Sequence, residues 1–229
     1  MANSFYRPSR ATPEEIAAHL AQVPTTFKLY KRLIDCAVVA FLLPGLLFCI
    51  LVLILFNPLF NRGPIFYRQP RIGLMGQPFG MLKFRTMVGV GDSPQFETGD
   101  KARVSRLGAF MRRTRVDEVP QILNVLKGEM SVIGPRPEQE DFVRQFSAEI
   151  PGYDLRHLVK PGITGLAQLK LGYTDDVKGA AHKLRWDMIY ISRMGGTMES
   201  YIVGRTFTFV MRRLGRTLTT RIPLGRNQR

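Results

Sequence analysis

The sequence predicts an α+β fold that is mostly helical, with an N-terminal re-entrant membrane helix, a small β-hairpin and amphipathic interfacial helices. Three observations predict this fold: an uncharged apolar run over residues 36–56, two short β-type runs around a Gly/Pro-rich connector, and a C-terminal stretch in which apolar residues alternate with arginines. The chain has 229 residues, enough for one domain and an anchor but short for two full domains. We divide it into an N-terminal extension (1–28), the membrane helix (29–60), a main domain (61–215) and a basic tail (216–229).

Charge and cysteine content narrow the classes of protein. Lys and Arg number 33 against 18 Asp and Glu, for a formal charge of +15, which implies anionic partners: nucleic acid, an anionic membrane surface or phosphorylated substrates. Composition does not choose among these. Both cysteines, Cys36 and Cys49, lie in the apolar run, so neither a disulfide framework nor a Cys-based zinc site is indicated, and the main domain is expected in the cytosol.

The apolar run from Cys36 to Phe56 is a membrane element. A straight helix of this length spans roughly 30 Å, about the hydrocarbon core of a bilayer. Pro44 and Gly45 interrupt the run midway, where a kink or a break is expected. Lysines and arginines flank both ends, whereas a single span usually shows asymmetry. A re-entrant helix that breaks at Pro44 and returns to the cytoplasmic side satisfies both observations; an ordinary kinked span is the alternative.

A β-hairpin is predicted from the runs 65–69 and 79–86 around the connector IGLMGQP. By the two-residue period of a strand, Lys83 and Arg85 share one face and Phe84 takes the other. Two cations on one face can bind phosphate, although a solvated basic edge explains them as well. The next stretch, 88–103, is predicted to be a polar loop.

The stretch 112–137, RRTRVDEVPQILNVLKGEMSVIGPRP, places adjacent carboxylates at a helix start with arginines on both sides. Asp117 can cap a helix that begins with Glu118, Val119 and Pro120. A carboxylate at a helix N-terminus is expected to stay ionised, which suits a nucleophile or a metal ligand. Taken alone, these residues favour the simpler interpretation, in which Asp117 only caps the helix.

Glycine and proline residues, together with the spacing of apolar residues, predict the structure of the later segments. The sequence predicts helices over 137–150 and 183–193, and an irregular loop over 159–169 that can approach a ligand closely. From Tyr201 onward an amphipathic helix at an anionic membrane surface is expected, with nucleic-acid binding as the alternative. There is no Walker-type loop and no GxGxxG motif.

Four ordered motifs together resemble the bacterial sugar transferase family, the small membrane-bound phosphoglycosyl transferases that start glycan assembly on polyprenol phosphate. They are the membrane run with its central Pro44, KFRTM at 83–87, the whole stretch 112–137, and KPGITGLAQL at 160–169. The resemblance runs from about Tyr30 to about Arg193 and outweighs a purely capping role for Asp117.

The resemblance implies a monotopic, Mg²⁺-dependent enzyme at the cytosolic face of the bacterial inner membrane. It would transfer a phosphosugar from a UDP-sugar to undecaprenyl phosphate and release UMP, as the first membrane step in making exopolysaccharide, O-antigen or a related glycan. Asp117 would be the nucleophile and Glu118 its partner, and both would hold the metal. The implied partners are UDP-sugar, polyprenol phosphate and membrane lipids rather than nucleic acid; a homo-oligomer is left open.

Several residues are candidates for binding the substrates, and the turn around Arg136 is expected to preset a phosphate contact. The candidates are Lys83, Arg85, Arg112, Pro135, Arg136, Pro137 and Gln168. The chain departs from the family after Gln168, where Lys170-Leu171 replaces an Asn-Gly-Arg type of turn, so the sugar contacts are not identified. Two rival functions remain at this point: a non-catalytic basic membrane-surface protein that recruits anionic partners, and a membrane-bound phosphatase.

Overall fold

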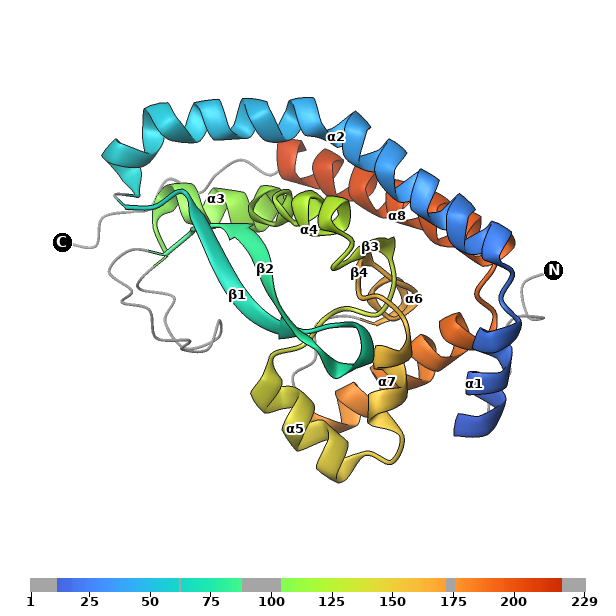
Figure 1. The fold of residues 1–229 in the computed structure, drawn as a ribbon. Coiled ribbons are helices and arrows are strands. Elements are labelled where there is room, and N and C mark those ends of the chain that lie inside the picture. Colours follow the sequence, from blue (N-terminus) through green and yellow to red (C-terminus); the bar gives the residue numbers. More distant parts are fainter. Residues whose placement is uncertain (1–11, 62, 88–103, 172–175, 220–229) are drawn as a thin grey trace.

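In the computed structural model, residues 12–61, 63–87, 104–171 and 176–219 are described, and they form a helical body beneath one long helix (Figure 1). The helices are α1 Pro13–Gln22, α2 Thr25–Phe60, α3 Arg106–Thr114, α4 Gln121–Lys127, α5 Glu140–Glu149, α6 Leu166–Lys170, α7 Val177–Ser192 and α8 Gly196–Thr219. The strands are β1 Phe66–Ile72, β2 Pro78–Phe84, β3 Ser131–Ile133 and β4 Gly162–Thr164. Short 3-10 turns are η1 Leu74–Gly76, η3 Val116–Glu118 and η4 Tyr153–Leu158. The predicted α+β, mostly helical fold is confirmed.

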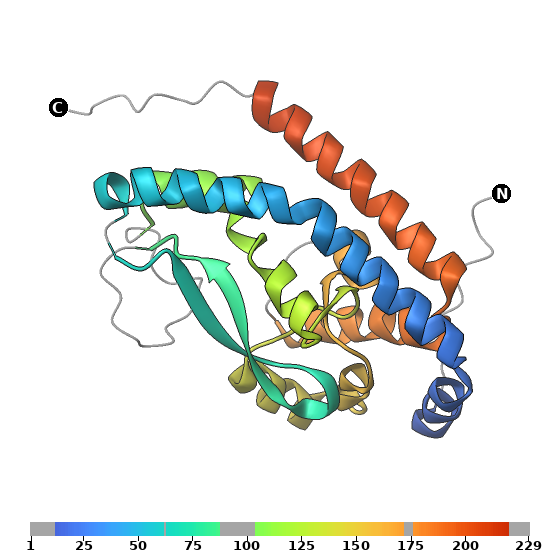
Figure 2. The same cartoon turned by 45° about the horizontal axis from the view of Figure 1, so that its top comes forward.

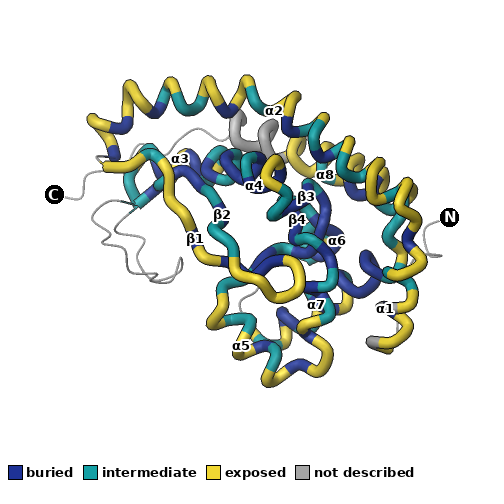
Figure 3. The backbone as a smooth tube through the Cα atoms, in the orientation of Figure 1, coloured by how far each residue is buried: buried dark blue, intermediate teal, exposed yellow. Residues whose placement is uncertain are grey.

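Helix α2 carries the apolar run and lies along the body by one narrow stripe. Among the described residues it is the one helix long and apolar enough to cross a membrane. Its buried residues, spaced by four or seven positions, fall on one side, and most of the remaining surface is exposed (Figure 3). They are Asp35, Val39, Leu46, Leu53 and Asn57. The wide exposed apolar face fits an association with membrane.

The predicted break at Pro44 is absent, since α2 continues through this residue. The helix changes direction near its middle instead, as both views show (Figures 1 and 2). A proline removes one internal hydrogen bond and bends a helix, and the turns on either side continue because Val39 and Leu46 pack on the same body. The expected kink is thus present as a bend within one helix.

The N-terminal half of α2 is fixed to the body by polar contacts. Lys31 Nζ donates to both carboxylate oxygens of Glu199, at 2.8 Å each, and to the carbonyl of Ile133 at 3.0 Å. Asp35 Oδ1 accepts from the Ser131 hydroxyl at 3.0 Å and from the Val132 N–H at 2.8 Å. These bonds connect α2 to α8 and to strand β3, which is followed directly by the GPRP motif at residues 134–137.

The C-terminal end of α2 is attached as well. Asn57 Nδ2 donates to the carbonyl of Gly63 at 2.7 Å, and Asn61 Nδ2 donates to the carbonyl of Arg85 at 2.7 Å. Both ends of the long helix therefore contact the same body.

The hairpin forms as predicted, with an antiparallel register that runs from Phe66↔Phe84 to Ile72↔Pro78. Asn124, fully buried, joins this hairpin to α4, the helix that follows the adjacent carboxylates Asp117 and Glu118, here called the dyad. Its Oδ1 accepts from the Leu82 N–H and its Nδ2 donates to the Gly80 carbonyl, both at 2.9 Å. One side chain thus supplies the hydrogen bonds that a third strand would make.

The GPRP and KPGITG motifs interlock through β3 and β4, which pair in parallel with Ser131 opposite Gly162 and Ile133 opposite Thr164. A Cβ at Gly134 would lie 2.4 Å from the Lys160 carbonyl oxygen, so the two backbones meet where no side chain fits. The sequence predicted an irregular loop over 159–169, but the structure has strand β4 and, from Leu166, helix α6 in this range.

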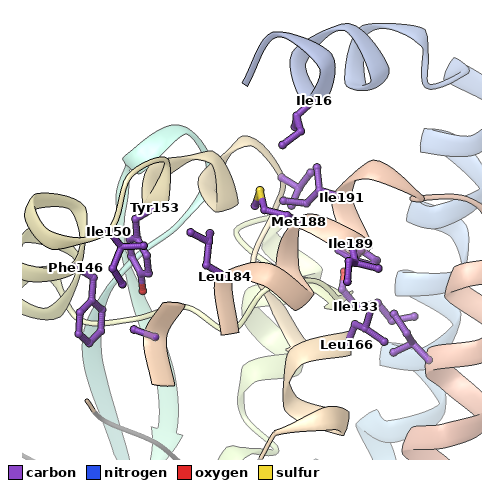
Figure 4. Close-up of a cluster of buried hydrophobic side chains, with 14 residues drawn as sticks. Ile16, Ile133, Phe146, Ile150, Tyr153, Leu166, Leu184, Met188, Ile189 and Ile191 are labelled. Carbon is purple, nitrogen blue, oxygen red and sulfur yellow. The ribbon is translucent and has the colours of Figure 1, made fainter. Parts of the chain in front are cut away.

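The core has two parts. One part joins α2 to β2 and α4, and the other gathers residues of α1, α5, α7 and the adjoining turns (Figure 4). Ile16 of α1 is 1% exposed in the second part, near Met188 and Ile191 of α7. This apolar residue anchors the helix of the N-terminal extension in the core.

Helix α8 matches the predicted C-terminal amphipathic helix. Its first turns are packed, with Glu199 and Ile202 buried, whereas later apolar side chains are exposed. The exposed ones are Tyr201, Val203, Phe207, Phe209, Val210 and Met211. The predicted polar loop at 88–103 and most of the basic tail, 220–229, lie outside the described residues.

Candidate active site

The two carboxylates lie in the turn η3, between α3 and α4. Arg115 has a left-handed backbone (φ 62°) and ends α3. The N–H groups of Glu118 and Val119 then bond to the carbonyls of Arg115 and Val116. Because the backbone satisfies these donors and α4 begins only at Gln121, Asp117 does not cap the helix. The predicted capping arrangement is wrong, and the dyad projects from a turn.

Glu118 is held as an anion by two arginines. Arg136 Nη2 lies 2.7 Å and Arg115 Nη1 2.9 Å from Glu118 Oε1, and Arg136 Nη1 lies 3.5 Å from Oε2. Burial alone would raise the pKa of Glu118, but the charge and hydrogen bond of Arg136, aided by Arg115 and Lys83, lower it to about 2.

Asp117 is in the opposite electrostatic state. It is 9% exposed, and its Oδ1 is buried with no hydrogen-bond partner among the described residues. Burial, and then the negative charge of Glu118, raise the pKa of Asp117 to about 6, although Lys83, Arg115 and Arg112 pull it down. The anion of Asp117 is therefore less favoured than a place at a helix N-terminus would make it, although a pKa of about 6 still leaves the carboxylate mostly ionised at pH 7. One carboxylate is a permanent anion and its neighbour titrates near neutrality.

Most of the predicted cations surround this dyad. Lys83 is buried at the end of β2 and its charge acts on both carboxylates. Arg112 Nε donates to Thr86 Oγ1 at 2.9 Å, and its charge acts on Asp117. Arg115, which was not predicted, adds a third positive charge near the two carboxylates.

Arg85 is the exception among the predicted cations. Its guanidinium donates to the carbonyls of Pro64 at 2.7 Å, Met87 at 3.0 Å and Asn61. Strand β2 ends at Phe84, so the two-residue period no longer applies one position later. Arg85 thus connects the end of α2 to the hairpin, and its predicted place beside Lys83 in the phosphate site is wrong.

The GPRP residues hold the Arg136 backbone. The carbonyl of Pro135 accepts from the Gly162 N–H at 2.9 Å, and that of Pro137 accepts from Arg71 Nη1 at 3.2 Å. Gln168 donates to the Ile163 carbonyl at 3.2 Å, while its buried Oε1 has no partner among the described residues. The prolines therefore act through their backbone, and Gln168 keeps an acceptor oxygen.

A cavity of about 600 Å³ opens beside Glu118. Six of its lining residues are basic and two are acidic, which favours an anionic ligand. The lining residues are Arg71, Arg115, Glu118, Arg136, Glu138, Arg156, Ile163, Thr164, Ala167, Gln168, Leu169, Lys170, Leu171, Lys183, Thr206, Phe209 and Val210. Asp117 lies next to the cavity rather than in its wall.

A buried ion pair supports Arg136 from behind. Arg156 lies 2.9 Å from the Asp187 carboxylate, and its Nη1 donates to the Tyr153 hydroxyl at 2.7 Å. Its Nη2 also donates to the Arg136 carbonyl at 2.9 Å. The pair thereby orders the backbone of the residue that holds Glu118.

None of the sequence motifs predicted a role for the pair Arg156–Asp187. One available signal was the position of Asp187, beside Met188 on the apolar face of the helix predicted over 183–193. A charge on such a face needs a buried partner.

The carboxylates of the site provide Mg²⁺ with only part of a ligand set. The described residues contain no group of three or more Asp, Glu, His or Cys side chains that could ligate a metal together. Mg²⁺ is commonly held by one or two carboxylates and the phosphates of a substrate, so the unpaired Oδ1 of Asp117 suits it. Both oxygens of Glu118 already contact arginines, so this residue would have to exchange a partner to join the metal.

Comparison with known proteins gives relatives over most of the chain. It is 41% identical over 157 residues to a UDP-N-acetylgalactosamine-undecaprenyl-phosphate N-acetylgalactosaminephosphotransferase of Aeromonas hydrophila, covering 68% of this chain and 37% of that protein. It is 38% identical over 201 residues to a UDP-glucose:undecaprenyl-phosphate glucose-1-phosphate transferase of Caulobacter vibrioides, covering 84% and 71%. The exopolysaccharide production protein PSS of Rhizobium leguminosarum bv. phaseoli is 35% identical over 186 residues, covering 77% and 89%.

Coverage of the relatives differs. The chain spans little more than a third of the Aeromonas protein and of a UDP-glucose transferase of Klebsiella pneumoniae, at 37% and 36%. The sequence profile described as "Bacterial sugar transferase" matches residues 26–213, from the start of α2 into α8. It therefore includes the membrane helix, the dyad and the interlocked glycine motifs. The chain belongs to the bacterial sugar transferase family.

Proposed function

We propose that this protein transfers a phosphosugar from a UDP-sugar to polyprenol (undecaprenyl) phosphate and releases UMP, through a covalent intermediate on Asp117. The observation that carries the proposal is the pair of carboxylates surrounded by cations, in which Asp117 keeps a buried unpaired oxygen. The names of the relatives support the substrate class, and they include both glucose and N-acetylgalactosamine donors. The sugar is therefore left unassigned.

In the first step a carboxylate oxygen of Asp117 attacks the phosphorus that bears the sugar. The phosphoanhydride bond breaks and UMP leaves with its electron pair, so an acyl phosphate links Asp117 to the sugar. Lys83, Arg112 and Arg115 offset the charge that collects on the phosphoryl oxygens. Glu118 holds Arg136 at a fixed place beside the reacting group.

In the second step a phosphate oxygen of the lipid acceptor attacks the same phosphorus. The bond to Asp117 breaks, the carboxylate is restored and the product is a polyprenyl diphosphate sugar. Two steps allow two anionic substrates to use one cationic site in turn. This avoids bringing both sets of negative charge together in one complex.

Mg²⁺, when bound, would neutralise phosphate charge and orient the diphosphate. Asp117 is the described residue best suited to contact it, with Glu118 beside it. The exposed apolar faces of α2 and α8 support a reaction at a membrane surface, and we propose that this surface is the cytosolic face of the bacterial inner membrane. In this location the transfer would begin assembly of an exopolysaccharide, O-antigen or related glycan.

The test uses purified protein in detergent with Mg²⁺, radiolabelled UDP-sugar and undecaprenyl phosphate. Label should pass to the lipid with release of UMP. Without acceptor, label should stay on the protein in a hydroxylamine-sensitive form, with about one equivalent of UMP per site.

Asp117→Asn should neither transfer nor become labelled, because the amide is a poor nucleophile. Near wild-type turnover in this variant would remove Asp117 from its proposed role. UMP formed only when both substrates are present would indicate direct transfer instead, and label released as free sugar phosphate would indicate a phosphatase.

A further inference from the structure

The body-facing stripe of α8 changes from buried to exposed along the helix. Glu199 and Ile202 are 5% and 0% exposed, but the same stripe continues at helical spacing to Phe209 and Val210, which are 53% and 43% exposed. Between them, Thr206 Oγ1 lies 2.9 Å from Thr164 Oγ1 of β4. Past this contact α8 extends away from the body (Figure 2). The core therefore covers only the first turns of this apolar stripe, and the later apolar residues are left exposed.

Phe209 and Val210 line the cavity beside the dyad, together with Leu169 and Leu171 at the end of α6. The same cavity is lined by Arg136, which is hydrogen-bonded to Glu118. The cavity thus has a cationic side chain near the two carboxylates and a cluster of apolar side chains from α6 and α8. Such a lining matches a ligand that has an anionic head and a hydrocarbon chain.

The α6 wall of this cavity is held in place by Lys170. Its Nζ lies 5.4 Å from the ring centroid of Trp186 in α7 and 5.9 Å from that of Tyr201 in α8. Cation–π contacts of this kind fix the end of α6 against both helices. Leu169 and Leu171 flank Lys170 in the chain, so their positions are set by these contacts.

We propose that the space between α6 and α8 is the entry and binding site of the polyprenol phosphate acceptor, with its isoprenoid chain against Phe209 and Val210 and its phosphate toward Arg136. This inference rests on the transfer function proposed above. It adds the location of the second substrate, and it assigns Phe209 as a residue that recognises the hydrocarbon chain rather than the sugar donor.

The lining favours the acceptor over the donor on chemical grounds. A UDP-sugar has one ring, its uracil, that could stack on Phe209, but it has no hydrocarbon chain to cover the aliphatic Val210, Leu169 and Leu171. The outer face of α8, which includes Phe207 and Met211, is also apolar and fits a membrane interface. A lipid can therefore reach Phe209 from the bilayer while keeping its chain in an apolar environment.

The test compares two phenylalanines on the same helix, using the full chain in detergent micelles. Phe209→Ala should raise the KM for undecaprenyl phosphate roughly 3- to 10-fold, the loss expected for part of one aromatic contact. The KM for UDP-sugar should not rise in parallel. With a short acceptor such as geranyl phosphate the difference from wild type should shrink, since less chain is available to contact the ring.

Phe207→Ala is the matched control, because Phe207 is 63% exposed and does not line the cavity. It should keep wild-type values for both substrates. Equal increases in acceptor KM for the two variants would show that α8 only contacts the micelle, and would overturn the proposal. An increase confined to the KM for UDP-sugar would assign the cavity to the donor instead.

A photo-crosslinking measurement on wild-type protein covers the case in which Phe209→Ala fails to fold. A prenyl phosphate that carries a benzophenone in its chain should label peptides of α6 or α8, in competition with undecaprenyl phosphate. Label confined to α2 would overturn the proposed location. If wild-type protein transfers no sugar phosphate to any lipid, the proposed function itself fails, whereas transfer without discrimination between Phe209 and Phe207 refutes only this inference.

Discussion

At the scale of single residues, the two adjacent carboxylates of the site have different electrostatic surroundings. Glu118 has cationic partners at hydrogen-bonding distance and a pKa of about 2, whereas Asp117 has a buried unpaired oxygen and a pKa of about 6. Divergent pKa values in one pair are typical of carboxylates with different roles. Asp117 is the group whose ionisation can govern a reaction near neutral pH.

This difference predicts the pH dependence of the reaction. Only ionised Asp117 can attack, so kcat/KM for UDP-sugar should rise with pH through about 6 and then level off. Arg115→Gln removes a positive charge that lowers the pKa of Asp117, so the rise should move to higher pH. Arg113→Gln, a neutralisation on the exposed side of α3, is the control and should leave the profile in place. An unchanged profile for Arg115→Gln would contradict this assignment.

A second prediction concerns the geometry of Arg136, which reaches both oxygens of Glu118. Arg136→Lys keeps the charge but replaces the planar donor with a single ammonium, so turnover should fall by about tenfold or more. The exposed pair Arg144–Glu140, at 3.0 Å, provides the control, and Arg144→Lys should keep the wild-type rate. Wild-type turnover in Arg136→Lys would show that the site needs only a positive charge there.

Asp117 and Glu118 should also change the free energy of unfolding in opposite directions. The pKa of Asp117 is raised from 3.8 to about 6, so its ionised form costs the folded state free energy that develops across this pH window and persists above it. At pH 8, without Mg²⁺ or substrate, Asp117→Asn should increase the free energy of unfolding by up to about 3 kcal/mol. Glu118 has a lowered pKa, so Glu118→Gln should be destabilising at the same pH. Thermal melts in detergent would compare the two variants, and shifts of equal sign would contradict the assigned environments.

At the scale of elements, the turn that carries the dyad is placed by α4 and the hairpin. Asn124 joins α4 to β2 through the Leu82 N–H and the Gly80 carbonyl, and Lys83 follows directly in the strand. A displacement of α4 from β2 would therefore separate Lys83 from the carboxylates. The position of the cation depends on a buried amide that performs no chemistry.

We expect Asn124→Ala to lower the free energy of unfolding by about 2 kcal/mol, because two partly buried backbone groups lose their partners. Turnover at a temperature where the variant is still folded should fall as well, since Lys83 is no longer aligned. Asn61→Ala is a useful comparison, because Asn61 also bonds a backbone carbonyl but lies at the end of α2. A stable Asn124→Ala protein with full activity would show that α4 is positioned by apolar packing alone.

The sequence was informative where the pattern is local. The hairpin, α5, α7 and the long apolar helix follow from periodicity and turn residues. The motifs singled out Asp117, Glu118, Lys83 and Arg136, which the structure brings together. What it could not provide is the choice of partner across the fold. Arg85 and Lys83 differ by two positions, yet one bonds carbonyls at the end of α2 and the other approaches the dyad. Likewise, the pKa of Asp117 depends on burial and on Glu118, which no spacing rule reports.

At the scale of the whole molecule, α2 is attached to one body at both ends. Lys31 and Asp35 bond to the β3 region, whereas Asn57 and Asn61 bond to residues around the hairpin. If α2 crossed a bilayer upright, one of these attachment points, with the polar body around it, would have to enter the hydrocarbon or detach. Backbone groups outside a helix or a closed barrel are costly in that environment. The attachments therefore favour a helix that enters the membrane with its bent apolar face and keeps both ends on one side.

This topology is tested by cysteine accessibility in intact cells. With Cys36 and Cys49 replaced by serine, single cysteines at Gln22 and Gln77, both exposed, report on the two sides of α2. A membrane-impermeant maleimide should label neither in intact spheroplasts and both in inverted vesicles, because both positions lie at the cytosolic face.

Pro44→Ala is a second test of the topology. Straightening the bend removes the geometry that favours return to the same side, so the fraction of protein with the two cysteines labelled from opposite sides should increase. Opposite-side labelling of Gln22→Cys and Gln77→Cys in the protein that keeps Pro44 would establish a full crossing. It would also require the contacts of Lys31 or of Asn57 to be absent in the membrane.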